Sequence, residues 1–279
     1  MTASRPARAG ASVLALLVTA CVVGPWIARH GPLESDFVHG ITSAATPVGP
    51  CHDFPLGADR LFRDELARFA WAGRLSLSIA VGSTALAAAL GTLVGLVSGW
   101  CASGPARLVD EVLMRAVDVL LALPFLLLVM AIGAALRETS AFTILVVLGV
   151  TGWLSLARVV RAKTIQVCAH DYVEAARALG QPPAWVVVRH VLPNVAGVIV
   201  VTATTQVAQM VVADSALGYL GLGISPPTPT WGRMLAEGQD YYLVAPWLVA
   251  VPGVAIFLAV WGFNMLGEGL RDALDPSQS

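Results

Sequence analysis

Long apolar runs without charged residues are the dominant pattern along this chain. A helix that crosses a bilayer needs about 20 mostly apolar residues, and the sequence provides six such runs. They are Ala9–Ala28, Leu75–Ala106, Val119–Leu136, Thr139–Ala157, Asn194–Leu222 and Tyr241–Gly267. No strand alternation typical of an outer-membrane barrel competes with them. The pattern therefore predicts an all-α, polytopic membrane protein with six transmembrane helices.

The composition agrees with this class. Of the 279 residues, 57% are hydrophobic and only 13% are charged, whereas soluble domains carry about 25% charged residues. A soluble globule of this size needs more polar surface to cover its core. The 17 basic residues are balanced by 18 acidic ones, which argues against a nucleic-acid partner and leaves membrane lipid as the surroundings.

The few basic residues predict the orientation, because Lys and Arg are enriched in cytoplasmic loops. With the N-terminus inside, ten of the 17 basic residues fall on the cytoplasmic side and seven outside, and five of these seven lie in residues 29–74. Both termini are therefore predicted to be cytoplasmic. The predicted regions are 1–28 (N-terminus and first span), 29–74 (periplasmic loop), 75–270 (a core of five spans with a cytoplasmic loop at 158–193) and 271–279 (cytoplasmic tail).

The N-terminal segment has a second interpretation. Residues Val18 to Cys21 resemble a lipoprotein cleavage box, which predicts an anchored lipoprotein with lipid on Cys21. Apolar sequence continues through Trp26 and Ile27, however, and five more spans follow. A first membrane helix is therefore the preferred interpretation.

The outer loop ends in a segment of mixed character. Residues 59–74 combine acids and arginines with apolar residues at helical spacing, which predicts an amphipathic helix at the membrane interface. Such a helix either contacts other protein segments or a partner on the outer side, or simply lies on the membrane surface; the family resemblance described below makes a periplasmic gate or a binding protein the expected contact.

The cytoplasmic loop at 158–193 is predicted to form a helix–turn–helix elbow. Asp171 is placed to cap the first helix, with Glu174 three residues on, as in a capping box. Gly180 is placed as its C-terminal stop. A second short helix is predicted over Pro183–Val191, which ends before Pro193.

The first helix of this elbow has one apolar face. That face comprises Tyr172, Ala175, Ala176 and Leu179, at i, i+3, i+4 and i+7. Its small alanines permit close approach. The pattern leaves two alternatives open: the face docks in a groove of another protein, or it packs against the chain's own helix ends.

Four polar residues within or near the spans are candidates for a transport path or a gate. An acid inside a bilayer is costly and is a functional candidate by default, which singles out Asp118 and Asp214. The structural alternative pairs Asp118 with Arg115 and places Asp214 near the outer face or a water-filled cavity. Gln206 and Gln209 either line the path or hydrogen-bond a neighbouring helix.

Several motifs resemble one family. Glu174-Ala175-Ala176, then Gly180, then Leu192-Pro193 is similar to the EAA loop in permease subunits of bacterial ABC importers, and Asp171–Gly180 resembles the dipeptide/oligopeptide/nickel branch. Further similar stretches are Pro55–Asp59, Val117–Pro124, Gly221–Gly232 and Gly269–Pro276. The resemblance covers about Phe54 to Pro276 and is strongest to the second permease of the pair. Phe62 departs from it, because the family usually has Gly there.

This resemblance implies that the membrane path and the ATPase sites lie in different subunits. The family's loop inserts into a cleft of a cytoplasmic ATPase, so Asp171, Tyr172, Glu174, Ala175, Ala176, Leu179 and Gly180 are expected to form the coupling element. The expected partners are a homologous permease, two cytoplasmic ATPases that bind ATP and Mg, and an extracytoplasmic solute-binding protein. The expected cargo is a peptide or a related small solute. The location implied is the bacterial inner membrane.

The sequence itself does not contain the P-loop motif of an ATP-hydrolysing protein. A P-loop needs G-x-x-x-x-G-K-[ST] to cradle phosphates, and Ala162 precedes Lys163, the single lysine. We therefore expect a non-enzymatic subunit with no catalytic residue, metal site or cofactor of its own. The alternative function is an ion-coupled secondary transporter that uses Asp118 or Asp214, which predicts internal repeats; none is evident in the sequence.

Overall fold

The computed structural model describes residues 5–104, 106–136 and 139–274. Every regular element in these ranges is helical, apart from three isolated bridges in the segment 35–64. Arg137 and the last five residues of the predicted 271–279 tail lie outside the described residues. The elements are α1 (Arg5–Ile27), α2 (Glu65–Cys101), α3 (Arg107–Leu121), α4 (Phe125–Ala135), α5 (Ala141–Cys168), α6 (Asp171–Ala178), α7 (Pro183–Val186), a π-helical turn (Val187–Val191), α8 (Leu192–Tyr219), α9 (Trp231–Gly238), a 3-10 turn (Gln239–Tyr241) and α10 (Trp247–Leu274).

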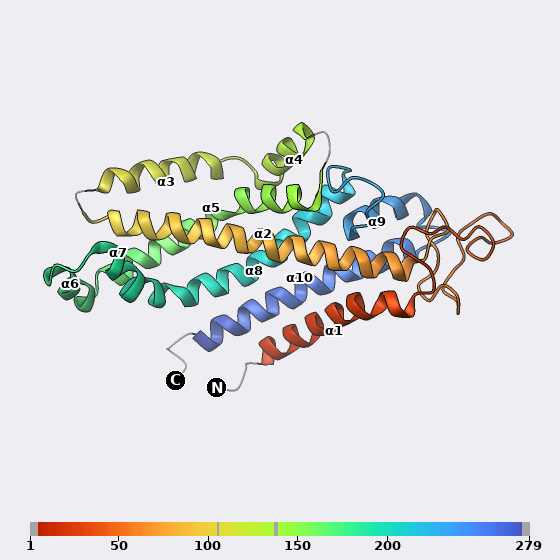
Figure 1. The fold of residues 1–279 in the computed structure, drawn as a ribbon, viewed down its shortest axis with the longest axis horizontal. Helices are drawn as coiled ribbons and strands as arrows, with labels where there is room; N and C mark the ends of the chain where they lie inside the picture. The colour runs from red at the N-terminus through yellow and green to blue at the C-terminus, as the bar shows by residue number, and fades with distance from the viewer. Residues whose placement is uncertain (1–4, 105, 137–138, 275–279) are drawn as a thin grey trace.

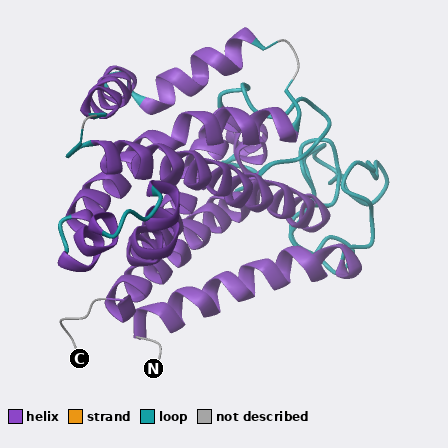
Figure 2. Ribbon diagram, turned by 60° about the vertical axis from the view of Figure 1, so that its left-hand side comes forward, coloured by secondary structure: helices purple, strands orange, loops and turns teal. Residues whose placement is uncertain are grey.

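The long helices run side by side along the long axis of the molecule (Figure 1). One end, called the elbow end below, holds α6 and α7 together with the start of α1 and the end of α10. The opposite end, the loop end, holds α9 and the segment 28–64, which connects α1 to α2. Figure 2 shows the long loop segments gathered at that end. The two sets of segments that the sequence assigns to opposite membrane faces thus lie at opposite ends of the bundle.

Five described helices are long and apolar enough to cross a membrane, and a sixth crossing is counted if the bent pair α3–α4 forms one span. The all-α class and the number of spans agree with the sequence prediction. The third predicted span, Val119–Leu136, is wrong as a single helix, because α3 and α4 meet at 81°. Pro124 explains the break: it has no N–H to donate and disfavours helical backbone at Leu123.

The helix α2 begins ten residues before the apolar run that predicts it. Asp64 caps α2 by accepting hydrogen bonds from the N–H groups of Leu66 and Ala67. Its 37 residues span about 55 Å at 1.5 Å per residue, which exceeds the bilayer core of about 30 Å. Part of α2 therefore extends beyond the hydrocarbon layer.

The predicted amphipathic surface helix at 59–74 is wrong. Residues 59–64 form a turn, and Arg63, Arg68 and Asp59 are buried in an ion-pair cluster with Glu237 of α9. The Nη2 of Arg68 lies 2.6 Å from an oxygen of Glu237. The charges therefore join α2 to α9 instead of facing lipid headgroups, and the partner that decides this lies 169 residues away.

A tight pair of helices, α2 and α5, forms the centre of the bundle. Gly91, Gly95 and Gly99 recur every fourth residue of α2, where small residues let helix backbones approach closely. A Cβ at Gly95 would lie 2.6 Å from the Cβ of Val160 and 2.7 Å from the carbonyl oxygen of Ala157. The two helices therefore behave as one packed unit.

The first helix packs as part of this bundle. Cys21 is 1% exposed within α1 and belongs to the main hydrophobic core. A lipid chain on Cys21 would have to leave that core, so the structure favours a membrane helix over the lipoprotein interpretation.

Candidate functional site

The elbow is fixed to the end of α5 by a compact apolar cluster. Val173 and Ala176 of α6 pack with Val167 and Cys168 of α5 and with Val186 of α7. Arg177 of α6 lies over the ring of Trp100 in α2, with 3.8 Å from its guanidinium carbon to the ring centroid. The elbow therefore rests on the α2–α5 pair.

The apolar face predicted for the first elbow helix is divided by the structure. Ala176 is buried, but Tyr172 and Leu179 are 44% and 79% exposed, and Glu174 and Ala175 are also exposed. The inward residue that the prediction missed is Val173, which is fully buried. Val173 and Ala176 hold the helix to the chain, while Tyr172, Ala175 and Leu179 remain open to a partner.

The N-terminal cap of α6 differs from the prediction, and its C-terminal stop agrees with it. The N-cap is His170, without a side-chain cap hydrogen bond, and Asp171 is the first helical residue; the predicted Asp171 cap is wrong. Asp171 and Glu174 still lie in the first turn, where acids favour the helix dipole. At the other end Gly180 has φ +73°. The Gln181 N–H donates to Ala176 O and the Gly180 N–H to Arg177 O, which is a Schellman motif.

The second elbow helix does not end before Pro193 as predicted. A π-helical turn at Val187–Val191 joins α7 directly to α8. Proline lacks an N–H and its ring clashes with the carbonyl four residues earlier. A local π-helical turn re-satisfies backbone groups next to a proline in a membrane helix, and here the Leu192 N–H donates to Val187 O. The second elbow helix, α7, therefore continues without a break into the membrane helix α8.

Aromatic side chains gather beside the exposed face. The His170 and Tyr172 rings stack at 5.7 Å between centroids, and His190 lies 6.2 Å from Tyr172 and 5.1 Å from Trp185. Sequence reasoning missed Trp185 and His190 as part of this surface. Both residues lie in the predicted second elbow helix, Pro183–Val191, and no local signal marks them as part of this surface.

A cavity of about 330 Å³ lies where α3 and α4 meet, against α5 and α8. Its polar lining comes from Thr151, Ser155, Gln206 and Gln209, and its apolar wall includes Leu123. Gln206 is buried and donates a hydrogen bond to Gly152 O at 2.7 Å, so it joins two helices. Gln209 is exposed and faces the cavity. Gln206 therefore lines the cavity and also bonds a neighbouring helix, whereas Gln209 lines the cavity.

The two candidate acids lie in different surroundings. Asp118 forms an ion pair with Arg158 of α5, so the predicted pairing with Arg115 is wrong; the partner is close in space but 40 residues away in sequence. Asp214 is 2% exposed in α8 and does not line the cavity at the α3–α4 junction. The structure does not bring Asp118 and Asp214 together with Gln209 in one cavity.

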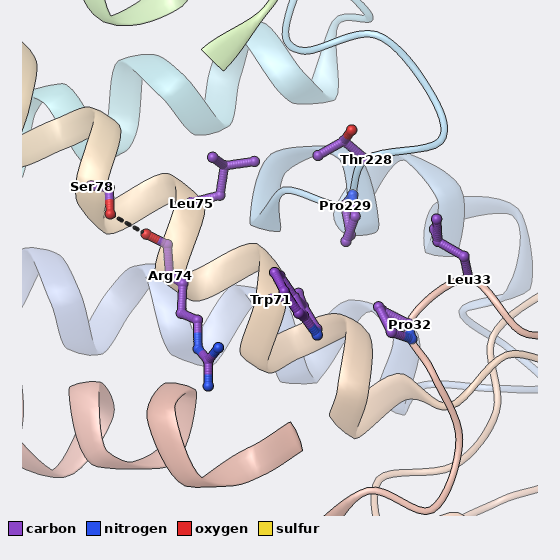
Figure 3. Close-up of a pocket in the computed structure, with 8 residues that line it drawn as sticks. All are labelled: Pro32, Leu33, Trp71, Arg74, Leu75, Ser78, Thr228 and Pro229. Carbon is purple, nitrogen blue, oxygen red and sulfur yellow. Dashed lines mark hydrogen bonds between the residues drawn. The ribbon is translucent and has the colours of Figure 1, made fainter. Parts of the chain in front are cut away.

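A second, apolar groove of about 480 Å³ opens near the loop end. It is lined by residues of α2 and by two loops: Pro32, Leu33, Trp71, Arg74, Leu75, Ser78, Thr228 and Pro229 (Figure 3). Arg74 extends from α2 toward α1, away from Thr228 and Pro229 (Figure 3). Among the described residues, no group of three or more His, Cys, Asp or Glu side chains is placed to hold a metal ion.

Two acids of the loop end have shifted proton affinities. Hydrogen bonds from the backbone N–H groups of His39 and Val38 lower the pKa of Asp36 to about 2. Burial raises the pKa of Asp64, against hydrogen bonds from the N–H groups of Ala67 and Leu66 that lower it. Both acids accept hydrogen bonds from nearby backbone N–H groups. Neither lines the cavity at the α3–α4 junction, which is called the central cavity below.

Comparison with known proteins identifies the family. A family model described as "Binding-protein-dependent transport system inner membrane component" matches residues 91–279. The chain belongs to that family. It is 37% identical to the di/tripeptide transport system permease DppC of Pseudomonas aeruginosa, over 98% of the chain and 88% of the relative. It is 33% identical to the oligopeptide permease OppC of Haemophilus influenzae (98% and 85%) and to OppC of Bacillus subtilis (97% and 85%).

The family assignment confirms the resemblance to ABC importer permeases that the sequence motifs indicate. The chain is a multi-pass, inner-membrane permease subunit of an ABC transport system, and it works with other transport components. The elbow stretch 171–193 and the cavity wall at Leu120–Leu128 both lie within the matched residues.

Proposed function

We propose that this permease forms half of a translocation path for peptides and couples it to ATP hydrolysis by partner subunits. It pairs with a homologous permease, two cytoplasmic ATPases that bind ATP and Mg, and an extracytoplasmic solute-binding protein. The elbow end faces the cytoplasm and the loop end faces the periplasm. In this proposal ATP and Mg are bound, and ATP is hydrolysed, by the partner subunits.

The observation that carries the proposal is the divided elbow helix. Val173 and Ala176 hold α6 to the α2–α5 pair, while Tyr172 and Leu179 point outward from it. A Leu side chain that is 79% exposed on a rigid base is suited to fill a pocket of a partner protein. Asp171, Glu174, Ala175, Ala176 and Gly180 would set the position of that face in an ATPase cleft.

The proposed cargo rests on the relatives, whose names specify oligopeptides and di- or tripeptides. The cavity is compatible with this cargo, because uncharged polar groups such as Gln209 and Thr151 lie among apolar side chains. The solute-binding protein that delivers cargo to this permease is expected to bind short peptides in a calorimetric titration. A preference for nickel or a sugar would contradict the peptide assignment without affecting the coupling role.

The coupling role is tested with Leu179→Asp in the assembled transporter. We expect the ATPase subunits to be lost on copurification, or their stimulation by the loaded binding protein to fall by about tenfold or more, since a buried interface anchor is worth about 2 kcal/mol or more. Leu243→Asp is the matched control, because Leu243 is equally exposed at 80% but lies at the loop end. Normal ATPase binding and stimulation in Leu179→Asp would contradict the proposal.

A second pair of variants tests the geometry of the elbow. Gly180→Val strains a residue with φ +73°, and Gly221→Val strains one with φ +77° at the loop end; an added Cβ meets open space at both. We expect Gly180→Val to uncouple uptake from ATP hydrolysis and Gly221→Val to leave their ratio unchanged. If uptake and coupling survive Gly180→Val in the assembled complex, the coupling role fails.

The alternative of an ion-coupled carrier predicts transport by the purified chain under a proton gradient. Asp118 is neutralised by Arg158, and Asp214 lies outside the central cavity. We therefore expect no uptake by the chain alone in proteoliposomes.

A further inference from the structure

The helix α3 is weakly packed for a membrane helix. Of its 15 residues only Asp110 and Val117 are buried. Leu108, Val112 and Val119 are 69%, 61% and 63% exposed. Apolar packing therefore does little to fix the position of α3 against the rest of the chain.

Two aspartate–arginine pairs tie α3 to α5. Asp110 accepts two hydrogen bonds from Arg161, at 2.6 Å from Nε and 2.7 Å from Nη2, and a third from Ser98 of α2. A bidentate pair of this kind fixes orientation as well as distance. Eight residues further along α3, which is about 12 Å, Asp118 pairs with Arg158. The second pair is half-exposed, with side-chain exposures of 48% and 50%, whereas Asp110 is 7% exposed.

The arginine partners lie on the helix that ends in the elbow. Arg158 and Arg161 are in the C-terminal half of α5, and two residues separate α5 from α6. Val167 of α5 and Val173 of α6 share one apolar cluster. Because α6 packs against the end of α5 and is not joined to it by a flexible linker alone, a displacement of the elbow moves the end of α5 with it.

The opposite end of α3 forms a wall of the central cavity. Leu120, Leu121 and Leu123 line the cavity at the point where α3 turns by 81° into α4. The residues of α5 that face the same cavity include Leu154 and Ser155, which lie about one turn before Arg158. The two ion pairs therefore lie between the elbow and the cavity wall.

We propose that the Asp110–Arg161 and Asp118–Arg158 pairs are positioning groups that carry movement of the elbow to the α3–α4 wall of the cavity. The proposal rests on the coupling function above and assigns four residues to the link between the elbow and the path. The pairs act on the shape of the cavity and touch no cargo. Since a weakly packed helix follows its strongest ties, loss of the pairs should uncouple the movement of α3 from that of α5.

The test uses the complete transporter with Leu123→Cys, in which serine replaces the four native cysteines. The probe is N-ethylmaleimide, and its rate of reaction with position 123 is measured without nucleotide and with ATP and vanadate. We expect the ratio of the two rates to differ from one in the parent. Arg161→Gln and Arg158→Gln should each reduce the difference between the two rates, so that the ratio moves closer to one. We expect the ratio to change by a factor of about two to thirty, the range for residues that carry coupling.

A matched control and a rescue separate positioning from stability. Arg107→Gln removes the exposed Arg107–Glu111 pair, which lies within α3 and does not reach α5; it should leave the ratio unchanged. The exchange Asp118→Arg with Arg158→Asp should restore much of the ratio that Arg158→Gln loses. All ratios are taken per assembled complex, so lower expression of the more buried Arg161→Gln does not alter the comparison, and the half-exposed Arg158 pair provides a second test.

The outcomes distinguish this proposal from the coupling function itself. If the parent responds to nucleotide and both arginine variants respond equally well, the ion pairs do not carry the movement. If Leu179→Asp uncouples the transporter but position 123 never responds to nucleotide, the elbow acts through another route and this inference is overturned. If the parent assembles with no ATPase, the coupling function fails first.

Discussion

Phe62 holds a backbone conformation that side chains with a Cβ seldom adopt. Its φ is +59°, and this is the position at which the family pattern usually has Gly. The turn is fixed by hydrogen bonds from the Phe62 N–H to Asp59 O and from the Asp36 N–H to Phe62 O. The ring contacts Phe37 edge to face at 5.5 Å between centroids. The departure from the pattern therefore retains the turn and adds an aromatic contact.

This strain gives a prediction at the residue scale. Phe62→Gly and Phe62→Ala both remove the ring, but only glycine adopts a positive φ without steric cost. We expect Phe62→Gly to be the more stable of the two by about 1 kcal/mol, measured by thermal unfolding of the purified protein in detergent. Greater stability of Phe62→Ala would show that the turn relaxes out of the left-handed region.

Single residues were predictable where local geometry decides their role. Gly180 ends α6 as expected, because a left-handed C-terminal residue is a local requirement. The partner of Asp118 was not predictable, since Arg158 comes from another helix. Gln206 and Gln209 both line the cavity, and only the packing of α8 against α5 gives Gln206 a hydrogen bond to Gly152 O as well.

At the scale of elements, α1 is attached to α2 through an unusual polar contact. Pro25 lies inside α1, so Cys21 O lacks the N–H donor four residues on. Arg74 of α2 supplies donors instead, at 3.0 Å to Cys21 O and 2.7 Å to Val22 O. Arg74 is the residue that Figure 3 shows extended toward α1. The arginine thus satisfies a backbone group that proline leaves open in an apolar region.

A double-mutant cycle checks this contact. Arg74→Gln should lower the midpoint of thermal unfolding in detergent, because an unsatisfied backbone carbonyl costs roughly 1–3 kcal/mol. In a Pro25→Ala background the restored N–H bonds Cys21 O, so Arg74→Gln should cost less by about 1 kcal/mol or more. Additive effects of the two changes would rule out the proposed contact.

The helices were predictable where a long apolar run of sequence defines them. Five of the six predicted runs correspond to long helices, because about 20 apolar residues have few alternatives in a bilayer. The remaining run, Val119–Leu136, is broken at Pro124, and apolar length alone did not reveal the break. The start of α2 was missed, since burial of Arg63 and Arg68 requires the carboxylate of Glu237 from α9.

For the whole molecule, the distribution of loops predicts which end faces which side. The four cysteines at positions 21, 51, 101 and 168 all lie in the described part of the chain, and Cys51 is the exposed one. Cys51 lies in the loop between α1 and α2, at the loop end (Figure 1). With that end outside, Cys51 is the native thiol accessible from the periplasm.

A membrane-impermeant maleimide tests the orientation in intact cells whose outer membrane is permeable to the reagent. We expect rapid labelling that disappears in Cys51→Ser and is unchanged in Cys101→Ser. Labelling that occurs only after the inner membrane is opened would place the loop end in the cytoplasm and reverse the proposed topology.

The sequence by itself determined the class of this protein, its number of crossings, the elbow and the family. These properties follow from the apolar length, from local turn chemistry and from motifs that are contiguous in the chain. Only the tertiary structure decided which face of α6 is open, which glutamine also bonds a neighbouring helix and which arginine pairs with each aspartate. The physical reason is that burial and charge pairing depend on distances between helices, and residues such as Asp118 and Arg158 become neighbours only when α3 and α5 pack together.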